Sequence, residues 1–307
     1  MNNKTRRFVA VDVLLILLMV LPLVAGMVLK ILFTPPSEGI SVTGAMIYFT
    51  IPMPLQPLPI SEAQVNSALV VLTILGICLY LTHGVRAGVK TRRQQVAEWI
   101  VETLDKMVKE NMGDYFAAFP PFVGAILILS AISSLLALLG LFAPTSDVNI
   151  VAGWGILVFI LITYYKLKGG LWNYLKGFTE PIPLLLPLNI LTEFSTPISM
   201  TFRHYGNVMS GSVIGVLLTA ALAGLSNLVL GWLPGFIGEF PLFRIGIPAV
   251  LSLYFDIFSG CMQAYIFATL TMLNISGAFP QDLFEERQRR KREKKAQKAA
   301  QEAAQEA

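Results

Sequence analysis

The residues of this chain that could carry out chemistry lie in two long apolar stretches, where polar side chains are few. The first stretch runs from about Ile198 to Trp232 and the second from Ile245 to Leu273. The polar residues that we single out are Arg203, His204, Asn207, Ser210 and Ser212 in the first stretch, and Asp256 and Gln263 in the second. Placing an ionisable group at membrane depth costs about 2.5–3.5 kcal/mol on insertion scales, so such a group indicates a function.

The spacing around Arg203 places a polar stripe on one helix face. Asn207 follows at i+4 and Ser210 at i+7, and the small residues Gly206 and Gly211 lie on or beside that face. One interpretation is a seam of small residues, which is common where membrane helices pack. The other is a slim face that lets another helix slide past an exposed guanidinium. The presence of Arg203 favours the second interpretation, because a seam between two packed helices does not need an arginine.

Asp256 and Gln263 are seven residues apart, so they share a face of a continuous α-helix. If Gln263 lies level with Arg203, Ser212 lies roughly 13 Å outward of the arginine and Asp256 roughly 10 Å outward. This geometry predicts a polar path from the outer surface that ends at a fixed positive charge. His204 lies about 100° round the helix from Arg203. We interpret it as bonding a neighbour, with a proton relay as the alternative.

The elements that position these residues are expected to be membrane helices. The chain is 55% hydrophobic and 14% charged, whereas soluble proteins carry about 25% charged residues. A spanning helix needs about 20 mostly apolar residues. We predict an all-α integral membrane fold whose last two helices form a long hairpin. The six predicted spans are Phe8–Phe33, Ser67–Leu81 with an extension to Gly88, Phe122–Phe142, Ile150–Tyr165, about Ile198–Trp232, and Ile245–Leu273.

The distribution of basic residues sets the orientation of these spans. In the six-span arrangement, 20 of the 23 Lys and Arg residues fall on one side, and only Lys30, Arg203 and Arg244 lie at or within spans. The positive-inside rule therefore places both termini in the cytoplasm. The first span is expected to be retained, because its apolar run exceeds the roughly 7–15 residues of a signal peptide.

Gln94–Met112 has the periodicity of an amphipathic helix. Its position on the basic side predicts a helix on the cytoplasmic membrane surface, and a plain connector helix is the alternative. Cys78 and Cys261 lie far apart in apolar runs and are expected to be buried and unbridged.

The chain contains no motif for nucleotide or metal chemistry. It has no Walker A loop, H-E-x-x-H sequence or nucleophile elbow, so we expect no cofactor, no metal site and no catalysis by this chain alone. A secondary transporter could use Arg203 to bind an anionic substrate, but such proteins have repeated halves, and none are found. A membrane scaffold would leave Arg203, Asp256 and Gln263 without a purpose.

Four segments resemble subunit a of F-type ATP synthases. The sequence PISMTFRHYGNVMSGSVIG, Pro197–Gly215, resembles the arginine signature of the family, with Gly-Asn three and four residues after Arg203. Cys261–Ser276 resembles its last helix, with its glutamine at Gln263. Gly177–Ser195, which contains Glu193, is similar to its cytoplasmic approach to the arginine helix, and Ala143–Ile150 to a short outer loop.

This resemblance implies a stator subunit with two offset half-channels that meet a rotating ring of c subunits. Arg203 would be the essential charge that blocks a direct leak between them. The implied ion path comprises Asn207, Ser212, Asp256, Gln263, Glu193 and His204. Many members of the family carry an acid or a histidine at the position of Ser212, and the complementary residue at the position of Asp256. This chain has a serine at that position instead, so the delivery of ions from the outer side departs from the family pattern.

The resemblance also implies the surroundings of the protein. We expect the c-ring, b-type peripheral stalk subunits and the rest of the ATP synthase as partners, with the lipid bilayer around them and no nucleic acid. The expected location is the bacterial inner membrane. The expected coupling ion is a proton, with Na⁺ as the alternative, because the ion-binding carboxylate should lie on the ring. The expected division is a membrane helix and extracytoplasmic loop over 1–66, an ion-channel domain over 67–276 and a charged cytoplasmic tail over 277–307.

Overall fold

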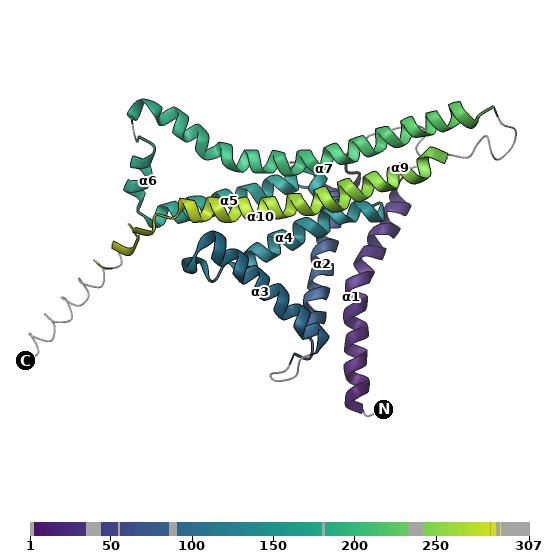
Figure 1. Ribbon diagram of the computed structural model, residues 1–307, viewed down its shortest axis with the longest axis horizontal. Coiled ribbons are helices and arrows are strands. Elements are labelled where there is room, and N and C mark those ends of the chain that lie inside the picture. Colours follow the sequence, from purple (N-terminus) through teal and green to yellow (C-terminus); the bar gives the residue numbers. More distant parts are fainter. Residues whose placement is uncertain are drawn as a thin grey trace, which may run out of the picture.

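The computed structural model describes residues 3–34, 44–54, 56–85, 91–179, 182–232, 242–282, 284–286 and 289. Nearly all of them are helical (Figure 1). Six helical segments of the described chain are long and apolar enough to cross a membrane: Val9–Phe33, Glu62–Thr82, Pro120–Leu139, Val148–Lys168, Pro183–Leu230 and Gly246–Ala278. The predicted all-α fold with six candidate spans is confirmed.

The first helices differ from the prediction mainly at their ends. Helix α1 is Asn3–Phe33 and α2 is Glu62–Thr82. Helix α2 begins five residues before the predicted Ser67, because a capping box starts it. The Gln64 amide donates to the Ser61 hydroxyl at 3.4 Å, and the Ser61 amide donates to the Gln64 side chain at 3.1 Å. Helix α2 ends at Thr82 and residues 83–85 are not helical, so this part of the predicted extension to Gly88 is wrong. Residues 86–90 lie outside the described chain.

Between α1 and α2 lies a small antiparallel hairpin that the sequence analysis did not predict. Its strands are β1, Ile47–Ile51, and β2, Leu58–Ser61. Ile51 pairs with Leu58 and Ile47 with Ser61. Strand β2 therefore leads directly into the cap of α2, and the hairpin fixes where α2 starts.

Between α2 and the long helix α7, described below, the chain forms spanning helices and several short helical segments. They are α3 (Arg92–Met112), η1 (Asp114–Phe116), α4 (Pro120–Leu135), η2 (Leu136–Leu139), η3 (Pro144–Ser146), α5 (Val148–Lys168), α6 (Leu171–Gly177) and η4 (Pro183–Leu185). Helix α3 covers nearly the predicted Gln94–Met112, while its position at the membrane surface stays a prediction.

Helix α7, Leu186–Leu230, has 45 residues and begins twelve residues before the predicted span. At 1.5 Å per residue it is about 68 Å long, more than twice the roughly 30 Å hydrocarbon core. It must therefore run strongly inclined to the membrane normal if it stays within the bilayer. Figure 1 shows it alongside the last helices and crossing the direction of α1 and α2.

The last predicted span is not one continuous α-helix. It consists of α9, Leu242–Ser252, a π-helical segment, η5, over Leu253–Ser259, and α10, Gly260–Ala278. A π segment bonds i to i+5 and holds more residues per turn than an α-helix. Asp256 lies inside it, so the continuous α-helix on which the shared face of Asp256 and Gln263 was predicted is not what the structure has.

Helix α1 packs closely against α2, and a side-chain bond joins it to α3. A Cβ atom at Gly76 would lie 3.0 Å from the backbone nitrogen of Met19, so glycine permits this close crossing. Near the start of α1, Arg93 donates to both carboxylate oxygens of Asp12, each at 2.7 Å, and His83 Nδ1 lies 3.1 Å from Asp12 Oδ1. Asp12 thus has partners on α3 and just after α2, which the sequence analysis did not predict.

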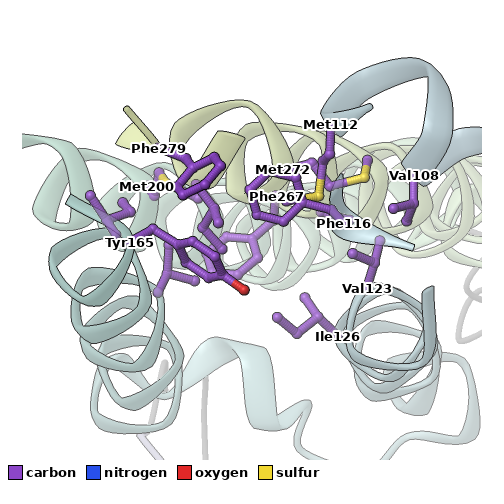
Figure 2. Close-up of a cluster of buried hydrophobic side chains, with 14 residues drawn as sticks. Val108, Met112, Phe116, Val123, Ile126, Tyr165, Met200, Phe267, Met272 and Phe279 are labelled. Carbon is purple, nitrogen blue, oxygen red and sulfur yellow. The ribbon is translucent and has the colours of Figure 1, made fainter. Parts of the chain in front are cut away.

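The main hydrophobic core joins α3, α4, α5, α7 and α10 (Figure 2). Its labelled members are Val108, Met112, Phe116, Val123, Ile126, Tyr165, Met200, Phe267, Met272 and Phe279. Met200 lies one turn before Arg203, so this core fixes the rotation of α7 near the arginine. Cys78 and Cys261 are free as predicted, but both are exposed on their helices rather than buried.

Candidate functional site

Arg203 lies on an exposed part of α7. Within the described part of the chain its guanidinium makes no ion pair. An arginine stays protonated in proteins, and an unpaired charge at membrane depth is costly. Its exposure on a spanning helix therefore calls for a negatively charged partner on another chain.

Gln263 is joined to the arginine helix through Asn207. The Asn207 side chain donates from Nδ2 to Gln263 Oε1 at 2.7 Å, and Gln263 is buried. The bond partner of Gln263 on α7 is thus Asn207, which follows Arg203 by four residues, about one helical turn. The bond ties α10 to α7 beside the guanidinium.

Ser212 and Asp256 line one cavity of about 720 Å³, which we call the Asp256 cavity. Its other polar side chains among the described residues are Ser252 and Thr219, and Asp256 is the only described lining residue with an ionisable side chain. The walls come from η2 and the residues after it, from α7, and from α9 with the π segment. The cavity thus has hydroxyl and carboxylate oxygens that suit a proton or a hydrated cation.

Glu193 lines a second cavity of about 340 Å³, the Glu193 cavity, formed by α5, α6, α7 and the end of α10. Its carboxylate accepts from Lys166 Nζ, and its side chain is 10% exposed. Burial raises the pKa of Tyr174, and the nearby Glu193 carboxylate raises it further, so this phenol stays protonated. The structure places Glu193 inside α7, whereas the sequence placed it in the approach to that helix.

His204 is fully buried and points away from the exposed face. Its Nε2 lies 3.2 Å from the Ser130 hydroxyl of α4, and its ring meets Trp154 and Phe267 edge to face. This arrangement bonds α7 to α4. The Ser130 partner and the Lys166 partner of Glu193 were both missed by sequence reasoning, although Ser130, Ser133 and Ser134 form a hydroxyl-rich patch that could have suggested a polar contact.

The contact between α5 and α7 sets the position of the turn before Arg203. A Cβ atom at Gly155 would lie 2.3 Å from Thr201 Oγ1 and 3.2 Å from the Pro197 carbonyl oxygen. Thr201 Oγ1 itself donates to Pro197 O at 2.9 Å. No side chain larger than hydrogen fits at Gly155 unless α7 moves.

We therefore expect Gly155→Ala to destabilise the folded protein by about 1–3 kcal/mol, as overpacking does. Thermal unfolding of the purified protein in detergent would show this as a lower midpoint. Gly153→Ala is the matched control, because a Cβ there meets no atom within 4 Å. Thr201→Ala should rescue part of the loss, and equal midpoints for the two glycine variants would contradict the packing argument.

The described residues contain no group of three His, Cys, Asp or Glu side chains that could hold a metal ion. The structure brings Ser212 and Asp256 to one cavity, Asn207 and Gln263 into one bond, and leaves Glu193 and His204 at separate places. Helix α7 thus contributes to two polar cavities, one at Glu193 and one at Ser212, and Arg203 lies between these two residues in the sequence. Arg203 has no ion-pair partner among the described residues. It suits the passage of ions rather than bond-making chemistry.

Comparison with known proteins places this geometry in a family. The ATP synthase A chain family matches residues 65–276. The sodium ion specific ATP synthase subunit a of Propionigenium modestum is 26% identical over 278 residues, covering 80% of this chain and 87% of the relative. ATP synthase subunit a 2 of Bradyrhizobium sp. is 30% identical, covering 72% and 90%. Subunit a of Legionella pneumophila is 25% identical, covering 72% and 87%.

Proposed function

Because the chain belongs to the ATP synthase A chain family, it is an ion-translocating stator subunit of an F-type ATP synthase, and we propose that Arg203 and its two flanking cavities form the ion path. The observation that carries the proposal is the exposed Arg203, which has no ion-pair partner in the described chain. Its partner is a carboxylate on the c-ring. The attraction is about 4 kcal/mol at close range with an effective dielectric constant near 20, which positions each carboxylate and still releases it.

The two cavities supply the two half-channels. Glu193 precedes Arg203 by ten residues and Ser212 follows it by nine, so along α7 they lie roughly 15 Å and 13 Å from the arginine in opposite directions. An ion enters through one cavity, binds the ring, travels round and leaves through the other. The fixed charge of Arg203 prevents direct passage. The bond between Asn207 and Gln263 holds α7 and α10 together at this point. The contact of His204 with Ser130 of α4 fixes the rotation of α7 about its own axis.

The chain is a multi-pass membrane protein and part of the ATP synthase complex. We assign the c-ring and b-type peripheral stalk subunits as its direct partners, and the catalysis of ATP synthesis to other subunits. We place it in the bacterial inner membrane with both termini in the cytoplasm. The relative from Propionigenium modestum is named sodium ion specific. The proton stays our predicted coupling ion here.

The experiment that tests the two half-channels measures from which side each cavity reacts. Ser212→Cys in the Asp256 cavity and Asn173→Cys in the Glu193 cavity are made in a background lacking Cys78 and Cys261. In oriented vesicles of the assembled complex, a charged, membrane-impermeant thiol reagent should label the first from the outer side and the second from the cytoplasmic side.

The matched control is Ile160→Cys on α5, which is 56% exposed but lines neither cavity. Facing lipid, it should react slowly from both sides. Labelling of both cavity cysteines from the same side would contradict the half-channel assignment.

A further inference from the structure

We propose that Lys30 of α1 is a positioning residue for the ion path, because it holds one wall of the Asp256 cavity in place. The inference rests on the proposed function of that cavity. Helix α1 lies outside the family match, which covers residues 65–276. We read its role from its contacts.

A polar cluster at the end of α1 carries the inference. Lys30 Nζ donates to the carbonyl oxygen of Gly140 and lies 3.7 Å from Glu62 Oε1. The same Glu62 oxygen accepts from the Phe142 amide at 3.3 Å, and Asn66 Nδ2 donates to the Phe142 carbonyl at 2.9 Å. Glu62 and Asn66 are only 2% and 1% exposed. Three side chains from two helices thus bond the backbone of one short segment, Gly140–Phe142.

This segment is a wall of the Asp256 cavity. Ala137, Gly140 and Leu141 line the cavity opposite α7. Gly140 ends η2 in the left-handed region with φ 71°, and its amide bonds back to Ala137 at 2.9 Å. Its carbonyl, by contrast, is bonded by Lys30. The lysine therefore holds this carbonyl on the side of α1, away from the cavity.

The attachment of α1 itself does not depend on Lys30. Its middle crosses α2 at Gly76, where the backbones come too close for a side chain, and its other end is fixed by the double hydrogen bond from Arg93 to Asp12. Loss of the lysine contact should thus leave α1 in place and release the wall. Gly140 both carries the freed carbonyl and lines the cavity, so we infer that the carbonyl turns toward the cavity oxygens and that the wall then narrows the cavity.

The test uses the reactivity of Ser212→Cys in the assembled complex, in a background lacking Cys78 and Cys261. Lys30→Met alone leaves Glu62 buried and unpaired, which is strongly destabilising. The informative variant is therefore Lys30→Met with Glu62→Gln, which loses the Gly140 contact but leaves no unpaired charge. The glutamine keeps an oxygen for the Phe142 amide. Glu62→Gln alone is the matched control, since Lys30 can still reach Gly140.

We expect the double variant to lower the labelling rate of Ser212→Cys from the outer side roughly tenfold, as loss of a charge-assisted hydrogen bond implies. The rate of Asn173→Cys in the Glu193 cavity should not change. Glu62→Gln and Lys30→Arg should label within about twofold of the parent, because each keeps a cationic donor for the Gly140 carbonyl.

Parental labelling rates in the double variant would overturn the inference. So would a failure of the double variant to assemble, because Lys30 would then hold the helix rather than the wall. The parent carries Ser212→Cys and keeps Lys30 and Glu62. If its cysteine does not react from the outer side, the proposed function itself is overturned. The two failures are therefore distinguishable.

Discussion

Replacing Arg203 by alanine is expected to abolish ATP-driven ion pumping. The ring carboxylate would lose a partner whose attraction is about 4 kcal/mol at close range, and nothing else on the exposed face of α7 replaces the charge in the described chain. Pumping is measured as ATP-driven acidification of inverted membrane vesicles. Recovery of the ring with the variant subunit would show that assembly is intact.

Arg203→Lys should also lose most of the activity. An ammonium group is strongly hydrated, lacks the planar fork of a guanidinium and loses its proton when buried. Lys109→Ala is the control, since that side chain is 72% exposed on α3 and lines neither cavity. Near-normal pumping by the Arg203→Lys variant would contradict the fixed-charge argument.

The second large effect is expected at Asp256, which alone among the described lining residues of its cavity has an ionisable side chain. A carboxylate that hands on protons contributes at least about a hundredfold in typical proton transfers. We expect Asp256→Asn to slow pumping at least about tenfold and to leave assembly with the c-ring intact, because asparagine has nearly the same shape.

Moving the acid across the cavity should restore part of the rate. Ser212→Asp combined with Asp256→Asn keeps one carboxylate in the same space, since both positions line it. Glu110→Gln, a change of the same chemistry at a side chain that is 63% exposed on α3, should have no effect. Wild-type pumping by Asp256→Asn would exclude Asp256 as a relay, and a failure to assemble would make it a structural residue.

The structure places Arg244 near the start of α9, but its side chain lies outside the described part of the molecule. Twelve residues separate it from Asp256, roughly 18 Å along a helix. The alternative role of Asp256 is a structural ion pair with Arg244. Restoration of pumping by Ser212→Asp combined with Asp256→Asn would favour the relay, because an acid on α7 would not recreate an ion pair between Arg244 and position 256.

The sequence was sufficient to predict the six candidate spans, because apolar runs of spanning length have few alternatives. It did not predict that α7 starts at Leu186. The prolines and polar residues between Leu186 and Ile198 are typical of a loop, and Pro187 is tolerated only because it lies in the first turn, where its missing amide costs nothing. The packing of Gly155 on Thr201 then supports the turns before the arginine.

Two features of the structure depend on tertiary contacts that no local pattern reports. The π segment around Asp256 packs Phe255 against Gly211 of α7, where a Cβ would lie 3.2 Å from that ring. The partner of Asp12 is Arg93, 81 residues away. Periodicity within one helix predicts which residues share a face, but it says nothing of register between helices. For this reason the bond between Asn207 and Gln263 could not be predicted from the sequence.

The central claim is that Arg203 keeps the two cavities from exchanging ions directly, and passive ion flux through a locked rotor tests it most directly. The c-ring is cross-linked to the stator in vesicles so that rotation stops, and the decay of an imposed ion gradient is measured. The wild-type complex should hold the gradient, and the complex with Arg203→Ala should lose it through a leak between the cavities. A locked Arg203→Ala complex that holds its gradient as well as the wild type would contradict the account.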